Sequence, residues 1–282
     1  MKMVLKITGC FVCLVMATQA LAAEGFTDDG YLGIDTHRLP SSQGPTGLFL
    51  MNSAHTLEAG EARVGGMVMY NDLNGADEDI YIPATFTLGL TDHLEVAAML
   101  PTVEFNRGAS TQAGTGDGKA FFKWRFHSQT PNLPEIALLL GAQLPTASDN
   151  QFEEVSDFAV ISGILLSAEM PWFDSVLGLH FEYQGIAVDP RSDTSIYQDD
   201  YSIVGFGLNA PISDDGRLHL ILESRKVSDR NLLADNTTSV LFGFRYMFKY
   251  LNWGVALTNS DSADATILDA EREIVVSLGL GF

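Results

Sequence analysis

The chain has 282 residues, with 36 Asp and Glu against 16 Lys and Arg, and its formal net charge is −20 at pH 7. This acidity argues against nucleic acid or bare anionic lipid as the binding partner. Hydrophobic residues make up 46% and aromatic residues 10% of the chain, so the apolar content is too high for a disordered acidic protein.

The N-terminus has the pattern of a secretory signal peptide. Lys2 and Lys6 precede an apolar run over residues 7–16, and small residues follow up to Ala22. The run is too short to cross a membrane as a helix, and we expect residues 1–22 to be removed after Ala22. A lipoprotein is the alternative, although the cysteine that would carry the lipid precedes the apolar run.

Both cysteines of the chain, Cys10 and Cys13, lie within this predicted signal peptide. The exported chain would then contain none. We therefore expect no disulfide, no thiolate metal site and no cysteine catalysis, even though the compartment would permit disulfides.

Residues 23–59 differ from the rest of the chain. They contain Pro40, Gly44 and Pro45 and show no alternation of apolar and polar residues. This composition predicts an irregular segment, either a periplasmic lead-in or a plug inside the domain that follows.

From residue 60 to residue 282 the sequence alternates in stretches of about ten residues that are separated by polar breaks. This pattern is typical of transmembrane β-strands. The twelve predicted strands are 60–70, 79–90, 94–104, 117–127, 135–144, 157–168, 174–184, 200–210, 217–227, 237–247, 251–259 and 272–282. Their links alternate between short turns and longer acidic loops, which predicts a bacterial outer-membrane barrel with both chain ends in the periplasm.

Charged and large apolar side chains fall on opposite faces of these strands. In 117–127, Phe122 and Trp124 share one parity, while Lys123 and Arg125 share the other. A soluble β-sandwich would also alternate. We favour a transmembrane, antiparallel, up-and-down β-barrel of about twelve strands, because the apolar face is rich in aromatics that gather near the predicted periplasmic rim.

The polar parity would face the barrel lumen. The candidate lumen-lining residues are Arg63, Glu95, Lys119, Lys123, Arg125, His180, Glu182, Arg217, His219, Glu223, Arg225 and Arg245. Two interpretations stay open. The charges select solutes by sign and size in a pore, or they form a structural network across a narrow lumen.

We predict no catalytic residue, no cofactor and no metal site, so the protein is not expected to be an enzyme. His127, His180 and His219 share the polar parity but have no metal-ligand spacing. The Gly-rich stretch GTGDGK at 114–119 departs from a phosphate-binding loop at two positions. We expect it to be a loop that leads into the strand 117–127.

Three stretches carry a family resemblance: GLTDHLEV at 89–96, GTGD at 114–117 and LGAQLPT at 140–146. In order and spacing they are similar to the landmarks of the outer-membrane transporter family named after the meta-pathway of phenol degradation. The resemblance implies a closed barrel that passes small, often apolar compounds. The stretches GPTGL at 44–48 and LEAG at 57–60 resemble the first strand of YjbH-type barrels, which are associated with exopolysaccharide export.

Together these features predict a Gram-negative outer-membrane channel, porin-like, that passes small molecules passively through a charged lumen. The alternative is a structural or export-associated barrel without its own pore. Expected partners are outer-membrane lipid, lipopolysaccharide, a small solute and the barrel assembly machinery. Phe282, which ends the stretch EIVVSLGLGF, resembles the C-terminal aromatic signal that this machinery recognises. We predict that deletion of Phe282 impairs membrane insertion.

Overall fold

A computed structural model describes eleven stretches of the chain. They are residues 39–73, 77–107, 110–130, 133–148, 158–172, 175–188, 200–213, 215–229, 237–248, 251–261 and 272–281. The predicted signal peptide and Phe282 lie outside these stretches. Within them, no helix is long and apolar enough to cross a membrane.

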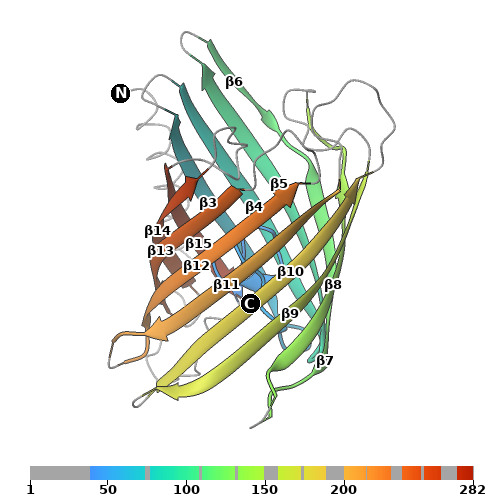
Figure 1. Cartoon of the computed structure of the whole chain (residues 1–282), viewed down its shortest axis with the longest axis vertical. Helices are drawn as coiled ribbons and strands as arrows, with labels where there is room; N and C mark the ends of the chain where they lie inside the picture. Colours follow the sequence, from blue (N-terminus) through green and yellow to red (C-terminus); the bar gives the residue numbers. More distant parts are fainter. Residues whose placement is uncertain are drawn as a thin grey trace, which may run out of the picture. The chain divides into compact units, whose positions relative to one another are not determined.

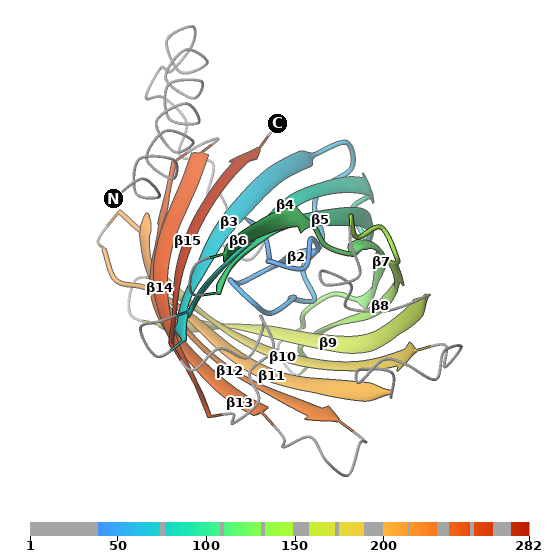
Figure 2. The same cartoon turned by 90° about the horizontal axis from the view of Figure 1, so that it is seen from above.

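Twelve antiparallel strands form a closed barrel, which confirms the predicted fold class (Figures 1 and 2). The strands are β3 (Ala62–Leu73), β4 (Asp77–Thr91), β5 (Leu94–Arg107), β7 (Gly118–His127), β8 (Glu135–Leu144), β9 (Ala159–Trp172), β10 (Ser175–Val188), β11 (Tyr201–Pro211), β12 (Leu218–Asp229), β13 (Thr237–Met247), β14 (Leu251–Asp261) and β15 (Arg272–Gly281). Closure occurs where β15 pairs with β3, with Gly281 opposite Arg63 and Ile274 opposite Tyr70. The terminal strand therefore has no open edge.

One element was not expected. Residues between two predicted strands, including the first two of the predicted Gly-rich loop, form β6 (Ser110–Thr115), which pairs with the second half of β5 from Thr102 to Arg107. The first half of β5 pairs instead with β7, from Leu94 to Met99. Thus β6 extends the barrel wall at one end, and the loop prediction for residues 114 and 115 was wrong.

The two ends of the barrel differ in their connections. Short links join β4 to β5, β9 to β10, β11 to β12 and β13 to β14, and we call this the turn end. Longer links join β8 to β9, β10 to β11, β12 to β13 and β14 to β15, and we call this the loop end. This asymmetry matches the sequence prediction except at two links. The link from β3 to β4, predicted to be long, spans only residues 74–76, and the link from β7 to β8 at the turn end spans residues 128–134.

The outer face of the barrel is apolar. Phe206 on β11 and Leu257 on β14 are each 59% exposed, and on β13 and β14 Tyr246 stacks with Trp253 at 6.1 Å between ring centroids. Their neighbours of opposite parity are buried. A surface of this kind is stable only in contact with lipid hydrocarbon, because water would solvate it poorly.

Residues 39–57, which come before β3, lie inside the barrel. Residues 39–57, which we call the interior segment, include β1 (Leu39–Pro40) and β2 (Thr46–Gly47), drawn in blue within the ring of strands in Figure 2. Every residue of the segment is buried except Gln43, which is partly buried, whereas residues 58–60 are exposed. The chain leaves the interior at Gly60, whose φ of +83° favours glycine.

Candidate functional site

Three buried carboxylates of the barrel wall bind the backbone of the interior segment. Glu95 on β5 accepts hydrogen bonds from the N–H of Thr46 at 2.9 Å and of Leu57 at 3.2 Å. Glu182 on β10 accepts from the N–H of Asn52 at 3.2 Å and from its side-chain amide at 2.6 Å. Both glutamates are completely buried.

Glu223 on β12 makes the densest of these contacts. Its carboxylate accepts three consecutive backbone N–H groups, those of Phe49 at 2.7 Å and of Leu50 and Met51 at 3.0 Å each. Successive N–H groups that converge in this way form an anion-binding concavity. Here the anion is a side chain of the barrel wall, so the interior segment is shaped around Glu223.

Two buried cations bind carbonyl groups of the same segment. Lys123 on β7 donates from Nζ to the carbonyl oxygens of Thr46 at 3.2 Å and Ser53 at 3.1 Å, and it forms an ion pair with Glu95 at 2.9 Å. Arg245 on β13 donates to the carbonyl of Gly47 at 3.3 Å, and its guanidinium lies 4.5 Å from the centroid of the Phe49 ring.

We call Glu95, Lys123, Glu182, Glu223 and Arg245 the anchor residues. The segment has only two-residue strands and some internal backbone hydrogen bonds, such as Ser42 N–H to the Phe49 carbonyl at 2.7 Å, and its other backbone groups include those that the wall binds. Buried backbone groups must be paired, and buried charges are costly unless they are paired and hydrogen-bonded. The anchor residues and the segment backbone meet both requirements together.

Glycines of the wall make room for the side chains of the segment. A Cβ atom at Gly207 would lie 2.4 Å from Leu48 Cδ1, and one at Gly205 would lie 2.9 Å from the terminal methyl of Met51. A Cβ at Gly254 would lie 2.7 Å from the ring of Phe49. The wall is therefore complementary to the segment in shape as well as in charge.

At the turn end, a second polar cluster holds the last part of the segment. His55 contacts Glu135 through Nδ1 at 2.6 Å, and Arg125 pairs with the same carboxylate at 2.9 Å. Ser167 accepts the N–H of Ala54 at 2.8 Å and lies 2.9 Å from His180 Nδ1. Register explains the last contact, since Ser167 lies opposite His180 in the β9–β10 pairing.

This Ser–His pair is no evident hydrolase site, because Ser167 is 1% exposed and covered by the interior segment. Among the described residues, no group of three or more His, Cys, Asp or Glu side chains is placed to hold a metal ion. The contacts described at the site are hydrogen bonds and charge pairs.

The remaining lumen candidates lie at three levels of the barrel. Arg63 pairs with Glu61 near the turn end, and His219 contacts Asn209 at 3.0 Å. Arg217 lies in the turn before β12, where its side chain is 36% exposed and 3.7 Å from Asp215. Lys119 and Arg225 line a small cavity above the interior segment.

The inner wall is apolar towards the loop end, which was not predicted from the sequence. There the buried inward residues are Met99 on β5, Ile161 on β9, Ile186 on β10 and Ile203 on β11. The three isoleucines belong to a cluster that also contains Ala54 of the interior segment. The sequence did contain an indication of this apolar wall, because at some strand ends the odd-numbered and the even-numbered residues are both apolar.

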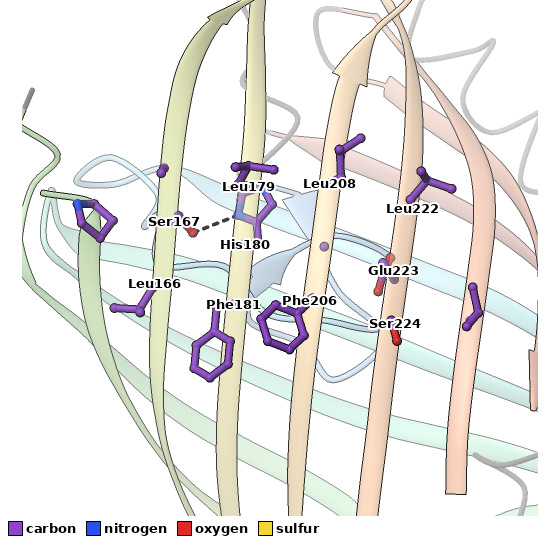
Figure 3. Close-up of a pocket in the computed structure, with 14 residues that line it drawn as sticks. Leu166, Ser167, Leu179, His180, Phe181, Phe206, Leu208, Leu222, Glu223 and Ser224 are labelled. Carbon is purple, nitrogen blue, oxygen red and sulfur yellow. Dashed lines mark hydrogen bonds between the residues drawn. The ribbon is translucent and has the colours of Figure 1, made fainter. Parts of the chain in front are cut away.

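The outer surface carries an apolar concavity of about 570 Å³ over β9 to β13 (Figure 3). Phe181 and Phe206 form its floor, with ring centroids 5.0 Å apart, and Leu179, Leu208 and Leu222 lie beside them in Figure 3. The concavity lies over Gly207, whose inner side contacts Leu48. The wall between lipid and the interior segment is thus thin at this point.

Comparison with solved structures gives the fold. The chain is similar to an outer membrane channel from Pseudomonas putida F1, with a TM-score of 0.61 and 10% identity over 81% of this chain and 98% of that chain. It also matches the NanC porin, with a TM-score of 0.49 and 10% identity over 78% and 98%. The match to the CymD monoaromatic hydrocarbon channel has a TM-score of 0.44 and 12% identity over 80% and 88%.

No family model and no curated protein sequence matches the chain. At 10% identity, the similarity to the Pseudomonas putida channel establishes a shared architecture. The chain therefore has the fold of an outer-membrane barrel, with its lumen occupied by residues 39–57 of the same chain.

Proposed function

We propose that the protein is an outer-membrane channel for small, mainly apolar molecules, and that residues 39–57 act as a plug that closes it. The observation that carries the proposal is the pairing of five buried anchor residues with the backbone of this segment. The similarity to a solved outer membrane channel supports the same function. So does the resemblance to the transporter family of the phenol-degradation meta-pathway.

The mechanism is passive. A solute enters at the loop end, where the inner wall offers Met99, Ile161, Ile186 and Ile203, and it passes only when the interior segment moves. Movement of the segment exposes the anchor residues to water. Hydration of their charges then offsets part of the free energy that is lost with the hydrogen bonds and ion pairs. The charges thus hold the plug in the closed state and line a hydrated path in the open state.

The wider assignments follow from this proposal. The apolar outer face contacts membrane lipid and lipopolysaccharide, the signal peptide directs export, and the barrel assembly machinery recognises Phe282. None of these steps requires a cofactor or a catalytic residue.

Solute uptake by Gram-negative cells tests the proposal. Cells whose outer membrane limits the entry of toluene would express the full chain, a variant lacking residues 39–57, or neither. We expect the deletion variant to raise the uptake of radiolabelled toluene several-fold, with little effect on a large sugar such as maltose. Equal toluene uptake in all three strains, with both barrels correctly assembled, would contradict the proposal.

The filled lumen also favours a second function, a closed barrel that organises an envelope or export complex. Residues 39–57 are buried and offer no surface to a partner in this state. A partner would therefore bind elsewhere on the chain. A deletion variant that assembles, conducts no solute and still copurifies with a periplasmic protein would support this function over the channel.

A further inference from the structure

A small cavity lies between the interior segment and the apolar inner wall of the loop end. It has a volume of about 20 Å³, which is room for one water molecule. Its apolar lining comes from Tyr81, Met99, Ile161, Ile186 and Ile203, and its charged lining comes from Lys119 and Arg225. The cavity therefore joins an apolar surface to two cations.

Arg225 on β12 is the unusual member of this lining. It is only 5% exposed, and its Nε atom has no hydrogen-bond partner. It forms no ion pair within the part of the chain that the structure describes. A buried guanidinium without a bound anion is costly, since burial removes its water without replacing it.

The neighbouring carboxylate, that of Glu182, interacts with Arg225 electrostatically but does not bind it directly. Glu182, Gly205 and Arg225 lie side by side in the β10–β11–β12 register, and the room at Gly205, between the two charged residues, is occupied by the side chain of Met51. Glu182 is instead hydrogen-bonded by Asn52 of the interior segment and by Gln184. The interior segment thus binds the carboxylate of Glu182, and the guanidinium of Arg225 faces the cavity.

We propose that Arg225 is the recognition residue for an amphipathic monocarboxylate, a ligand with a small apolar body and one carboxylate. A guanidinium suits a carboxylate because it can donate two parallel hydrogen bonds. Lys119 adds positive charge at the same cavity, and the Ile and Met side chains contact the apolar body. This inference rests on the proposed function and names a substrate class for the same lumen.

The cavity also indicates how such a ligand acts on the plug. A volume for one water is smaller than the ligand, so the ligand displaces the side chain of Gln43, the one partly buried residue of the interior segment. Gln43 is held by a hydrogen bond from Gln184 at 3.0 Å and donates to Leu50 at 3.4 Å. These neutral bonds are weaker than those of the anchor residues.

Calorimetric titration of the full chain in detergent tests the site, with benzoate as the probe and benzamide as its neutral counterpart. We expect benzoate to bind at least tenfold more tightly than benzamide, because a hydrogen bond to a charged group is stronger than a neutral one. Arg225→Gln should abolish this preference, and Arg225→Lys should keep part of it. Lys226→Gln, the exposed neighbour on the outer face, serves as the matched control and should change nothing.

Equal binding of benzoate and benzamide by the unchanged chain overturns the inference, as does an unchanged preference in Arg225→Gln. If Arg225→Gln does not assemble, the inference is still tested by the preference of the unchanged chain for benzoate over benzamide and by the size of that preference in Arg225→Lys. Benzoate binding without solute passage in any variant would contradict the channel and leave the site intact. Passage in the variant lacking residues 39–57, without a preference for benzoate, would contradict only the site.

Discussion

The two halves of the inner wall, towards the turn end and towards the loop end, make different kinds of contact. Towards the turn end, Glu95, Lys123 and Glu223 form hydrogen bonds with the backbone of the interior segment. Towards the loop end, the inward side chains are apolar: Ile186 and Ile203 belong to a cluster that includes Ala54 of the interior segment, and Val275 belongs to one that includes Leu50. One half therefore holds its occupant through directional hydrogen bonds, while the other half offers an apolar surface without directional contacts.

This difference changes the meaning of the charges in the lumen. The sequence left two interpretations open, a selective pore and a network in which Arg and Glu side chains pair with one another. Among the anchor residues one such pair occurs, Lys123 with Glu95. The other contacts of the anchor residues are made to the interior segment. The charged network therefore includes a part of the chain that precedes the barrel strands.

Removal of one anchor residue towards the turn end should lower the stability of the barrel more than a substitution towards the loop end. Glu223→Ala leaves three buried N–H groups without an acceptor and Arg245 without a nearby carboxylate, which we expect to cost about 3–5 kcal/mol. The measurement is the urea midpoint of the barrel in lipid vesicles. Ser224→Ala, the next residue along β12 and on the outer face, is the control, and an equal midpoint for both variants would refute the role of Glu223.

Loss of shape complementarity should have a smaller effect. Gly207→Val places side-chain atoms where Leu48 lies, since even a Cβ would be 2.4 Å from Leu48 Cδ1, and we expect a cost of about 1–3 kcal/mol. The variant should also conduct more often in planar bilayers, because the interior segment is displaced. Gly185→Ala, whose Cβ meets only Ser162 at 4.0 Å, should behave like the unchanged chain.

The smallest effect is expected in the loop-end half. Ile186→Val removes one buried methylene and should cost about 0.5–1.5 kcal/mol. Because Ile186 packs within the wall cluster, the opening frequency in bilayers should stay the same. An increase in current comparable to that of Gly207→Val would show that both halves hold the segment, and the contrast between them would fail.

The sequence predicted the barrel well because its wall obeys a local rule. Alternation alone placed the strands Glu135–Leu144 and Thr237–Met247 with both boundaries correct. The prediction ended β10 at residue 184, whereas the strand continues to Val188. There Ile186 and Val188 face inward and are apolar, so the alternation that marks a strand disappears.

The site could not be predicted in the same way. Asn52 and Glu182 are 130 residues apart, and Phe49 and Glu223 are 174 apart, so no local pattern relates them. The interior segment also has no period, since its own strands have two residues each and much of its backbone binds side chains of the wall. The sequence therefore placed the charges on the inner face but gave no indication of what they bind.

Single-channel recording in planar bilayers tests the central claim most directly. The claim is that residues 39–57 close a barrel that would otherwise conduct. The full chain should give a low or rare current, and the variant lacking residues 39–57 should give large, steady conductance steps from a barrel that resists unfolding by detergent. Equal currents from the two correctly assembled proteins, or none from either, would contradict the claim.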